Sequence, residues 1–163
     1  NDNFHPENSH VIPALMQRFH QAKVNNDAEV VVWGTGNAMR EFLYVDDMAE
    51  ASLFVLELDE KTYQANTKPM LSHINIGTGR DVTIREMAKT MKQVVGYKGQ
   101  LIFDRAKLDG APRKLINVSR LENMGWKYSV DLKNGLEETY GWYLENSVFS
   151  KVGLRMVVAK VKD

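Results

Sequence analysis

The sequence of 163 residues contains no cysteine. This absence excludes disulfides and thiolate-held zinc or iron–sulfur centres, and nothing in the composition indicates an oxidising compartment. The four histidines, at positions 5, 10, 20 and 73, lack the His-x-x-x-His or carboxylate spacing of a metal site. We therefore expect a cytoplasmic protein without a metal site.

The chain also lacks an excess of charge and a long apolar run. Its 21 Lys and Arg residues balance 21 Asp and Glu residues, so no overall field attracts polyanions. No apolar segment approaches the roughly 20 residues of a membrane span, and the first residues lack the pattern of a signal peptide. We expect neither nucleic acid nor a membrane as a partner.

Two features of a nicotinamide-dependent dehydrogenase are missing. The Gly-Thr-Gly turns at 34–36 and 77–79 lack the third glycine of a dinucleotide-binding turn, because those positions hold Met39 and Val82. No tyrosine is followed four residues later by the lysine that would lower its pKa for proton transfer. The chain also begins at Asn1 without an initiator methionine, so we expect it to be a fragment of a longer sequence.

Hydrophobic periodicity predicts an α/β protein with the character of an α+β fragment. The expected helices are 10–24, Asp46 or Asp47 to about 59, 83–95, 118–126 and 132–146. The expected strands are 29–33, 42–45, 73–77 and 100–104, with a surface loop at 60–70. Asp46 or Asp47, a Thr83–Glu86 capping box and Asp131 are the expected helix caps. These strands are too few and too scattered for a complete doubly wound sheet.

Several side chains are candidates for a binding site. His10 lies where a helix dipole favours a neutral imidazole, which suits catalysis, although a surface role remains an alternative. Trp33 ends a strand before a glycine turn, so it either presents a flat face to a ligand or packs in the core. Arg40 and the pair Arg113-Lys114 lie on loops and suit a diphosphate, unless they are solvated surface charges.

The segment from Trp33 to Asp47, with the pattern WGTGxxxREFLYVDD, resembles extended short-chain dehydrogenases that act on nucleotide sugars. The stretches 3–14, 73–79 and 109–115 are similar to those of the GDP-L-fucose synthase family. The resemblance covers roughly residues 2 to 147, so we expect a substrate-binding domain at 1–147. Residues 148–163 match nothing in that family and are expected to be an extension of unknown role.

The resemblance implies an enzyme that epimerises GDP-4-keto-6-deoxy-D-mannose at C3 and C5 and then reduces C4 with NADPH. It implies that His10 is an acid/base of epimerisation and lies near the nicotinamide end of NADP. The side chains that it implies face the GDP-sugar are Arg18, Trp33, Arg40, Asp109 and Lys114. It also implies a homodimer whose first half supplies the Rossmann sheet, the Ser-Tyr-Lys triad and a catalytic cysteine.

Because that half is absent from this sequence, we expect the chain alone to be inactive and to bind no NADP tightly. We also expect the helix after Asp47 to expose an apolar face that the missing half would cover. Two alternatives remain open. One is a related nucleotide-sugar epimerase such as a GDP-colitose synthase, and the other is a non-catalytic binding module with the same fold.

Overall fold

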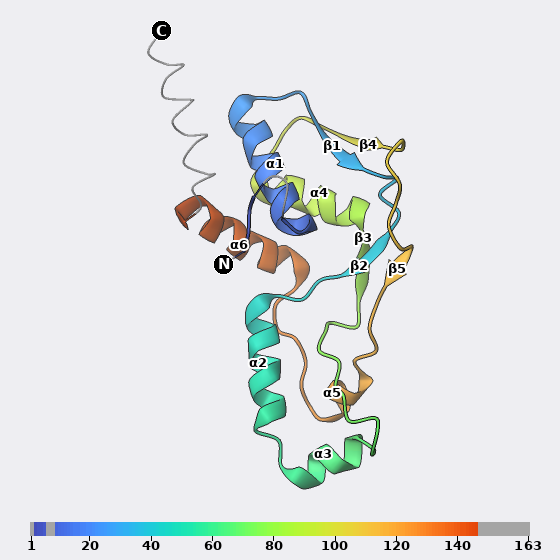
Figure 1. Cartoon of the computed structure of the whole chain (residues 1–163). Coiled ribbons are helices and arrows are strands. Elements are labelled where there is room, and N and C mark those ends of the chain that lie inside the picture. The colour runs from blue at the N-terminus through green and yellow to red at the C-terminus, as the bar shows by residue number, and fades with distance from the viewer. Residues whose placement is uncertain (1, 6–8, 147–163) are drawn as a thin grey trace.

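The structure is a computed structural model that describes residues 2–5 and 9–146 (Figure 1). The predicted extension at 148–163 lies outside the described residues. The helices are α1 (Val11–Asn25), α2 (Val45–Leu56), α3 (Glu60–Asn66), α4 (Ile84–Val95), α5 (Ser119–Asn123) and α6 (Leu132–Asn146). The strands are β1 (Glu29–Trp33), β2 (Met39–Glu41), β3 (Asp81–Thr83), β4 (Gln100–Asp104) and β5 (Arg113–Lys114).

The main core lies where α1, α4 and α6 pack together beside β1 (Figure 1). Apolar side chains at helical spacing on α1, such as Leu15, Met16 and Phe19, are fully or nearly fully buried there. Alternate residues of β1, Val30 and Val32, point into the same core. The side chains of Glu29, Val31 and Trp33 therefore lie on the opposite, more exposed face of the strand.

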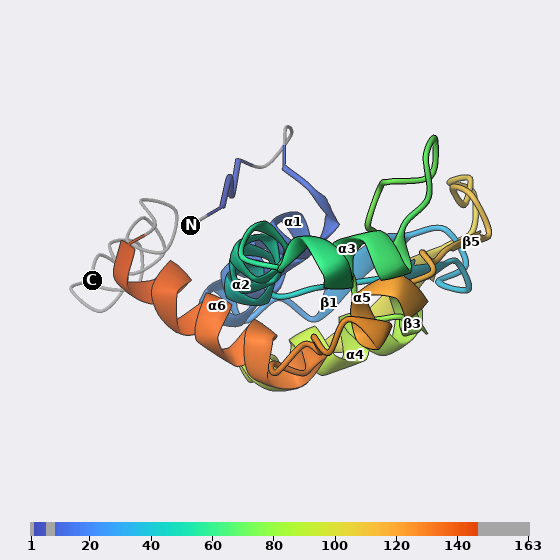
Figure 2. The same cartoon turned by 90° about the horizontal axis from the view of Figure 1, so that it is seen from below.

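A second, smaller core lies at the opposite end of the molecule. Ala51 of α2, Leu121 of α5 and Trp126 are buried together there. Figure 1 shows α2, α3 and α5 extending below the main core, and Figure 2 shows α6 and α4 along one side of the molecule when it is seen from below.

The strands form two small sheets rather than one. β1 pairs in parallel with β4, from Glu29 opposite Gln100 to Trp33 opposite Asp104. The other sheet has the order β3-β2-β5, in which β2 runs antiparallel to β3 and parallel to β5. The expected fold class is therefore confirmed, since this is a mixed α/β arrangement without a doubly wound sheet among the described residues.

The elements with the clearest sequence patterns lie close to their predicted positions. The helices at 84–95 and 132–146 and the strands at 29–33 and 100–104 have the expected positions. The Thr83–Glu86 capping box is present, with the Thr83 side chain accepting from the Glu86 backbone and the Glu86 side chain accepting from the Thr83 backbone. Asp131 accepts a hydrogen bond from the Asn134 backbone at 2.9 Å, as a helix cap does.

Two predictions around α2 are wrong. The strand expected at 42–45 is absent, because Phe42 and Leu43 use their side chains to pack against the two cores while the backbone pairing ends at Glu41. The residue before the helix is Tyr44, which makes no side-chain cap, and neither Asp46 nor Asp47 has that role. The Asp47 carboxylate instead bonds the segment before α6.

Two further predictions fail between 60 and 77. The expected loop contains α3, which begins where Asp59 accepts hydrogen bonds from the backbone and hydroxyl of Thr62. The strand expected at 73–77 is absent, because the neighbouring strand β2 pairs with 81–83 instead. A strand needs a partner for its backbone, and no described strand lies in register with 73–77.

Candidate functional site

A groove of about 440 Å³ runs between α1 and β1. Helical spacing places Ala14, Gln17, Arg18 and Gln21 on one wall, one and two turns apart. The strand period of two places Glu29, Val31 and Trp33 on the facing wall. Its size lies within the range of small-molecule sites, which is about 300 to 1,000 Å³.

Trp33 lies at one end of this groove with its ring open to solvent. Its exposed fraction is 65%, so the alternative of a core tryptophan is wrong. The guanidinium carbon of Arg18 lies 6.0 Å from the ring centroid and the Lys107 ammonium lies 5.5 Å from it. Arg18 also donates to the Val31 carbonyl at 2.7 Å, which fixes this cation beside the strand. An exposed ring with cations beside it suits a flat, anionic ligand.

The glycine turn after Trp33 is built around Asp109. The Asp109 carboxylate accepts from the Thr35 backbone at 3.0 Å and from the Thr35 hydroxyl at 2.5 Å. Gly34 is at φ +83°, and a Cβ there would collide with the same carboxylate, so only glycine fits. The loop that follows β4 is thereby held directly beside Trp33.

Arg85 holds the other side of this turn, a role that the sequence analysis missed. Its guanidinium lies 3.7 Å from the centroid of the Phe103 ring and donates to the Thr35 carbonyl at 2.5 Å. The backbone of Arg85 also donates to the Gly36 carbonyl at 2.9 Å. An arginine one residue into a capped helix gave no signal of this role, because the contact depends on tertiary packing.

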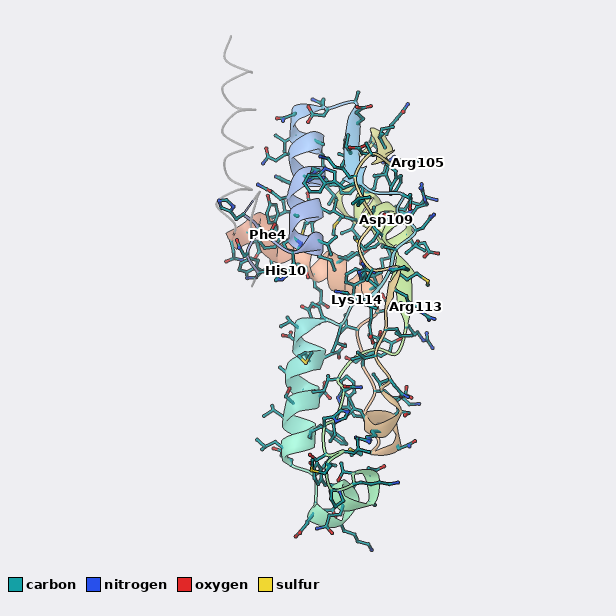
Figure 3. All side chains as sticks on the ribbon, turned by 45° about the vertical axis from the view of Figure 1, so that its right-hand side comes forward. Phe4, His10, Arg105, Asp109, Arg113 and Lys114 are labelled. Carbon is teal, nitrogen blue, oxygen red and sulfur yellow. The ribbon has the colours of Figure 1, made fainter. Side chains whose placement is uncertain are left out.

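Arg40 and Lys114 are brought together by the pairing of β2 with β5, where they are register partners. One Arg40 nitrogen donates to the Met39 carbonyl, and another lies close to Gly110 of the Asp109 loop. Figure 3 shows Asp109, Arg113 and Lys114 along this side of the molecule. The structure thus gathers four of the expected substrate-facing residues, Trp33, Arg40, Asp109 and Lys114, around one turn and one strand pair.

Arg113 has a different partner from the one that its position suggested. Its guanidinium binds the carboxylate of Asp81 with nitrogen–oxygen distances of 2.5 and 3.1 Å. The Arg113 hydrogen bond lowers the pKa of Asp81 below its usual range. This ion pair joins β5 to β3, so the Arg113 guanidinium is already bound to a carboxylate of the same chain.

The second Gly-Thr-Gly turn is occupied by Glu41, another residue that the sequence analysis missed. The Glu41 carboxylate accepts from the Gly79 backbone at 2.7 Å and from the Ile116 backbone at 3.1 Å. A turn rich in backbone N–H groups can bind a phosphate, but here a carboxylate of the same chain accepts from it. This turn therefore has a structural role.

His10 is exposed at the start of α1, where it precedes the helix without a side-chain cap. Because the chain reverses direction between α1 and β1, this end of α1 lies toward Trp33 and away from the connection at 26–28. In the view of Figure 3, His10 lies at the beginning of α1 and is separated from Asp109 and Lys114. His20 is buried with its Nδ1 atom 3.0 Å from the Tyr140 hydroxyl, and His73 is exposed.

The part of the chain that the structure describes contains no group of three or more His, Cys, Asp or Glu side chains able to hold a metal ion. In the same residues, no helix has the length and apolar character needed to cross a membrane.

The chain is similar to several known proteins. A profile of the NAD dependent epimerase/dehydratase family matches residues 1–77. GDP-L-fucose synthase of Escherichia coli K12 is 60% identical over 145 residues, which are 89% of this chain and 45% of that protein. The chain is homologous to GDP-L-fucose synthases.

GDP-L-colitose synthase of Yersinia pseudotuberculosis is a more distant homologue, 36% identical over 143 residues that make up 88% of this chain and 43% of that protein. The structure of a GDP-L-fucose synthetase from Naegleria fowleri bound to NADP superposes with a TM-score of 0.73 at 28% identity, covering 89% of this chain and 43% of that one. The chain spans about half the length of the GDP-L-fucose synthases that it matches.

Proposed function

We propose that residues 1–147 form the nucleotide-sugar-binding domain of a GDP-L-fucose synthase, which converts GDP-4-keto-6-deoxy-D-mannose into GDP-L-fucose with NADPH. The observation that carries the proposal is the cluster in which Trp33 is exposed, with Arg18 and Lys107 beside its ring and the Asp109–Thr35 contact next to it. The greater identity to GDP-L-fucose synthase than to GDP-L-colitose synthase supports this substrate over the colitose precursor.

Each side chain has a role in this proposal. Trp33 offers its ring to the nucleoside, with Arg18 beside it, and Asp109 accepts hydrogen bonds from hydroxyl groups of the ligand. Arg40 and Lys114 neutralise the diphosphate, since charge-assisted hydrogen bonds are the strong ones at an anion. Most of these residues lie on paired strands or on the segments beside them, which supports one extended ligand as their common partner.

His10 is proposed as one acid/base of the epimerisation. Protons next to the C4 ketone of the substrate are acidic enough for positioned side chains to remove and return. A second acid/base must act on the opposite face of the sugar, and the resemblance assigns that role to a cysteine. This sequence has none, so we expect the purified chain to show negligible epimerase and reductase activity.

NADP would supply the hydride for the reduction at C4. Of the residues in this chain, His10 would lie near the nicotinamide. The expectation that the chain alone binds no NADP tightly stays a prediction. The cytoplasmic location and the homodimeric state of the whole enzyme also stay predictions.

The first test is isothermal titration of the purified chain with GDP and then with GDP-mannose. We expect weak binding that Arg40→Ala reduces about tenfold or more, because a lost hydrogen bond to a charged group is worth about 1.5 to 3 kcal/mol. Lys89→Ala on α4 removes a cation from an exposed helical position and should leave the affinity unchanged. Equal losses in both variants, or no binding by a folded chain, would contradict the proposed site.

A further inference from the structure

The groove between α1 and β1 extends well beyond Trp33, and the residues there have a distinct chemistry. Trp33 lies at one end of the strand, and the connection at 26–28 closes the other. Between them the groove is lined by Arg18, the glutamines Gln17 and Gln21, and the acidic residues Asp27 and Glu29. A phosphate would be repelled by these carboxylates, so this part of the groove suits a ligand that donates hydrogen bonds.

Guanine has the matching pattern of donors and acceptors. Its N1–H and N2 amino groups are adjacent donors that a single carboxylate accepts together, while O6 and N7 are acceptors that suit arginine. Adenine and the pyrimidines do not present this combination. A groove with an aromatic ring, a guanidinium and a carboxylate along one line has the chemistry to favour guanine over the other bases.

We infer that Glu29 is a specificity-determining residue that accepts hydrogen bonds from N1 and N2 of a guanine base lying along the groove beside Trp33. This inference rests on the proposed function, because it concerns the nucleotide part of the same ligand. Arg18 donates to the Val31 carbonyl, and Val31 lies between Glu29 and Trp33 on the strand. In this inference the Arg18 guanidinium, which also lies beside the Trp33 ring, faces the O6 and N7 edge of the base.

Strand geometry favours Glu29 over Asp27 for this role. Glu29 and Trp33 are four residues apart on the same exposed face of β1, about 13 Å from one Cα atom to the other at the usual strand rise. A purine beside the indole and the extended Glu29 side chain cover that distance together. Asp27 lies before the strand in the connecting turn, where its carbonyl accepts from the Tyr97 hydroxyl.

Inosine diphosphate tests the inference because it differs from GDP only in lacking the N2 amino group. We expect the unmodified chain to bind GDP about tenfold more tightly than inosine diphosphate, the usual size of one discriminating base contact. Glu29→Gln places an amide where two acceptors are needed, so the ratio of the two affinities should fall to within about twofold of one. Isothermal titration measures both ligands against both proteins.

Asp27→Asn is the matched control, since it removes a carboxylate from the same groove and should leave the ratio unchanged. Glu29 is exposed, so urea unfolding should show equal stability for Glu29→Gln and the unmodified chain. A ratio near one in the unmodified chain, or an unchanged ratio in Glu29→Gln, overturns the inference while leaving GDP binding intact. Failure of the folded chain to bind GDP at all overturns the proposed function and this inference with it.

Discussion

At the scale of single residues, Asp47 shows how a carboxylate can look like a helix cap in the sequence and hold tertiary structure instead. Only 2% of Asp47 is exposed, and its carboxylate accepts from the Ser129 backbone at 3.0 Å, the Ser129 hydroxyl at 2.7 Å and the Val130 backbone at 3.0 Å. Burial alone would raise the pKa of Asp47, but the hydrogen bonds from Ser129 and Val130 hold it below the usual value of 3.8.

Asp47→Ala should therefore destabilise the chain by about 1 to 3 kcal/mol, because buried donors lose their acceptor. A lowered pKa in the folded state means that this stabilisation is present above pH 3.8 and is lost as the pH falls through the lowered value. The difference in unfolding free energy between the unmodified chain and the variant should thus shrink below that pH in urea titrations. Asp46→Ala, an exposed neighbour in the same helical turn, should cost much less.

The candidate site was predictable from single residues only in part. Trp33 and Arg40 stand out in the sequence because they flank a glycine turn, and the structure brings both to that turn. Arg85 and Glu41 could not be found in this way, since their contacts with Thr35 and Gly79 join segments 38 to 50 residues apart.

At the scale of elements, the turn between β1 and β2 is the most demanding piece of backbone in the site. Gly36 has φ +79°, and a Cβ there would lie 2.5 Å from the Phe103 ring. Gly36→Ala should therefore destabilise the chain by about 1 to 3 kcal/mol, combining left-handed strain with displacement of the ring. Thermal unfolding monitored by circular dichroism measures the loss.

Gly141 provides the opposite case within α6. Nothing lies within 4 Å of a Cβ at this position, and its backbone is helical. Gly141→Ala should stabilise the chain by about 0.5 to 1 kcal/mol, because alanine restricts the unfolded chain more than glycine does. An unchanged or raised melting temperature in Gly36→Ala would contradict the strained turn, and a lowered one in Gly141→Ala would contradict the open space around α6.

Elements with their own local signals were the predictable ones. The capping box at Thr83 and the β-branched run of β1 specify structure within a few residues, and both formed where expected. The segment 73–77 has a strand-like sequence, but strand formation requires a neighbour for its backbone. Sequence propensity alone does not contain that information, and β2 pairs with β3 instead.

At the scale of the whole molecule, α2 presents the apolar face that the sequence predicted. Its exposed apolar side chains are Val45 at 60%, Met48 at 42%, Leu53 at 58% and Leu56 at 80%. At 100° per residue they fall within one stripe, while the buried Asp47 and Ala51 lie on the other side of the helix. Soluble monomers rarely leave such a stripe uncovered, so we expect this chain to associate with itself through α2 as concentration rises.

Leu53→Gln combined with Leu56→Lys should weaken this association, because the two substitutions remove apolar area that the monomer leaves in water. Neither side chain is buried in a core, so the melting temperature of the monomer should change little. Sedimentation velocity over a range of concentrations measures the association. The matched control is Met70→Gln together with Leu108→Lys, which alters two side chains that are each 97% exposed but lie on loops away from α2. Association that persists in the α2 variant and is lost in the control would place the contact on the loops rather than on α2. If the unmodified chain were a monomer at every concentration, the apolar stripe of α2 would not be sufficient to drive association.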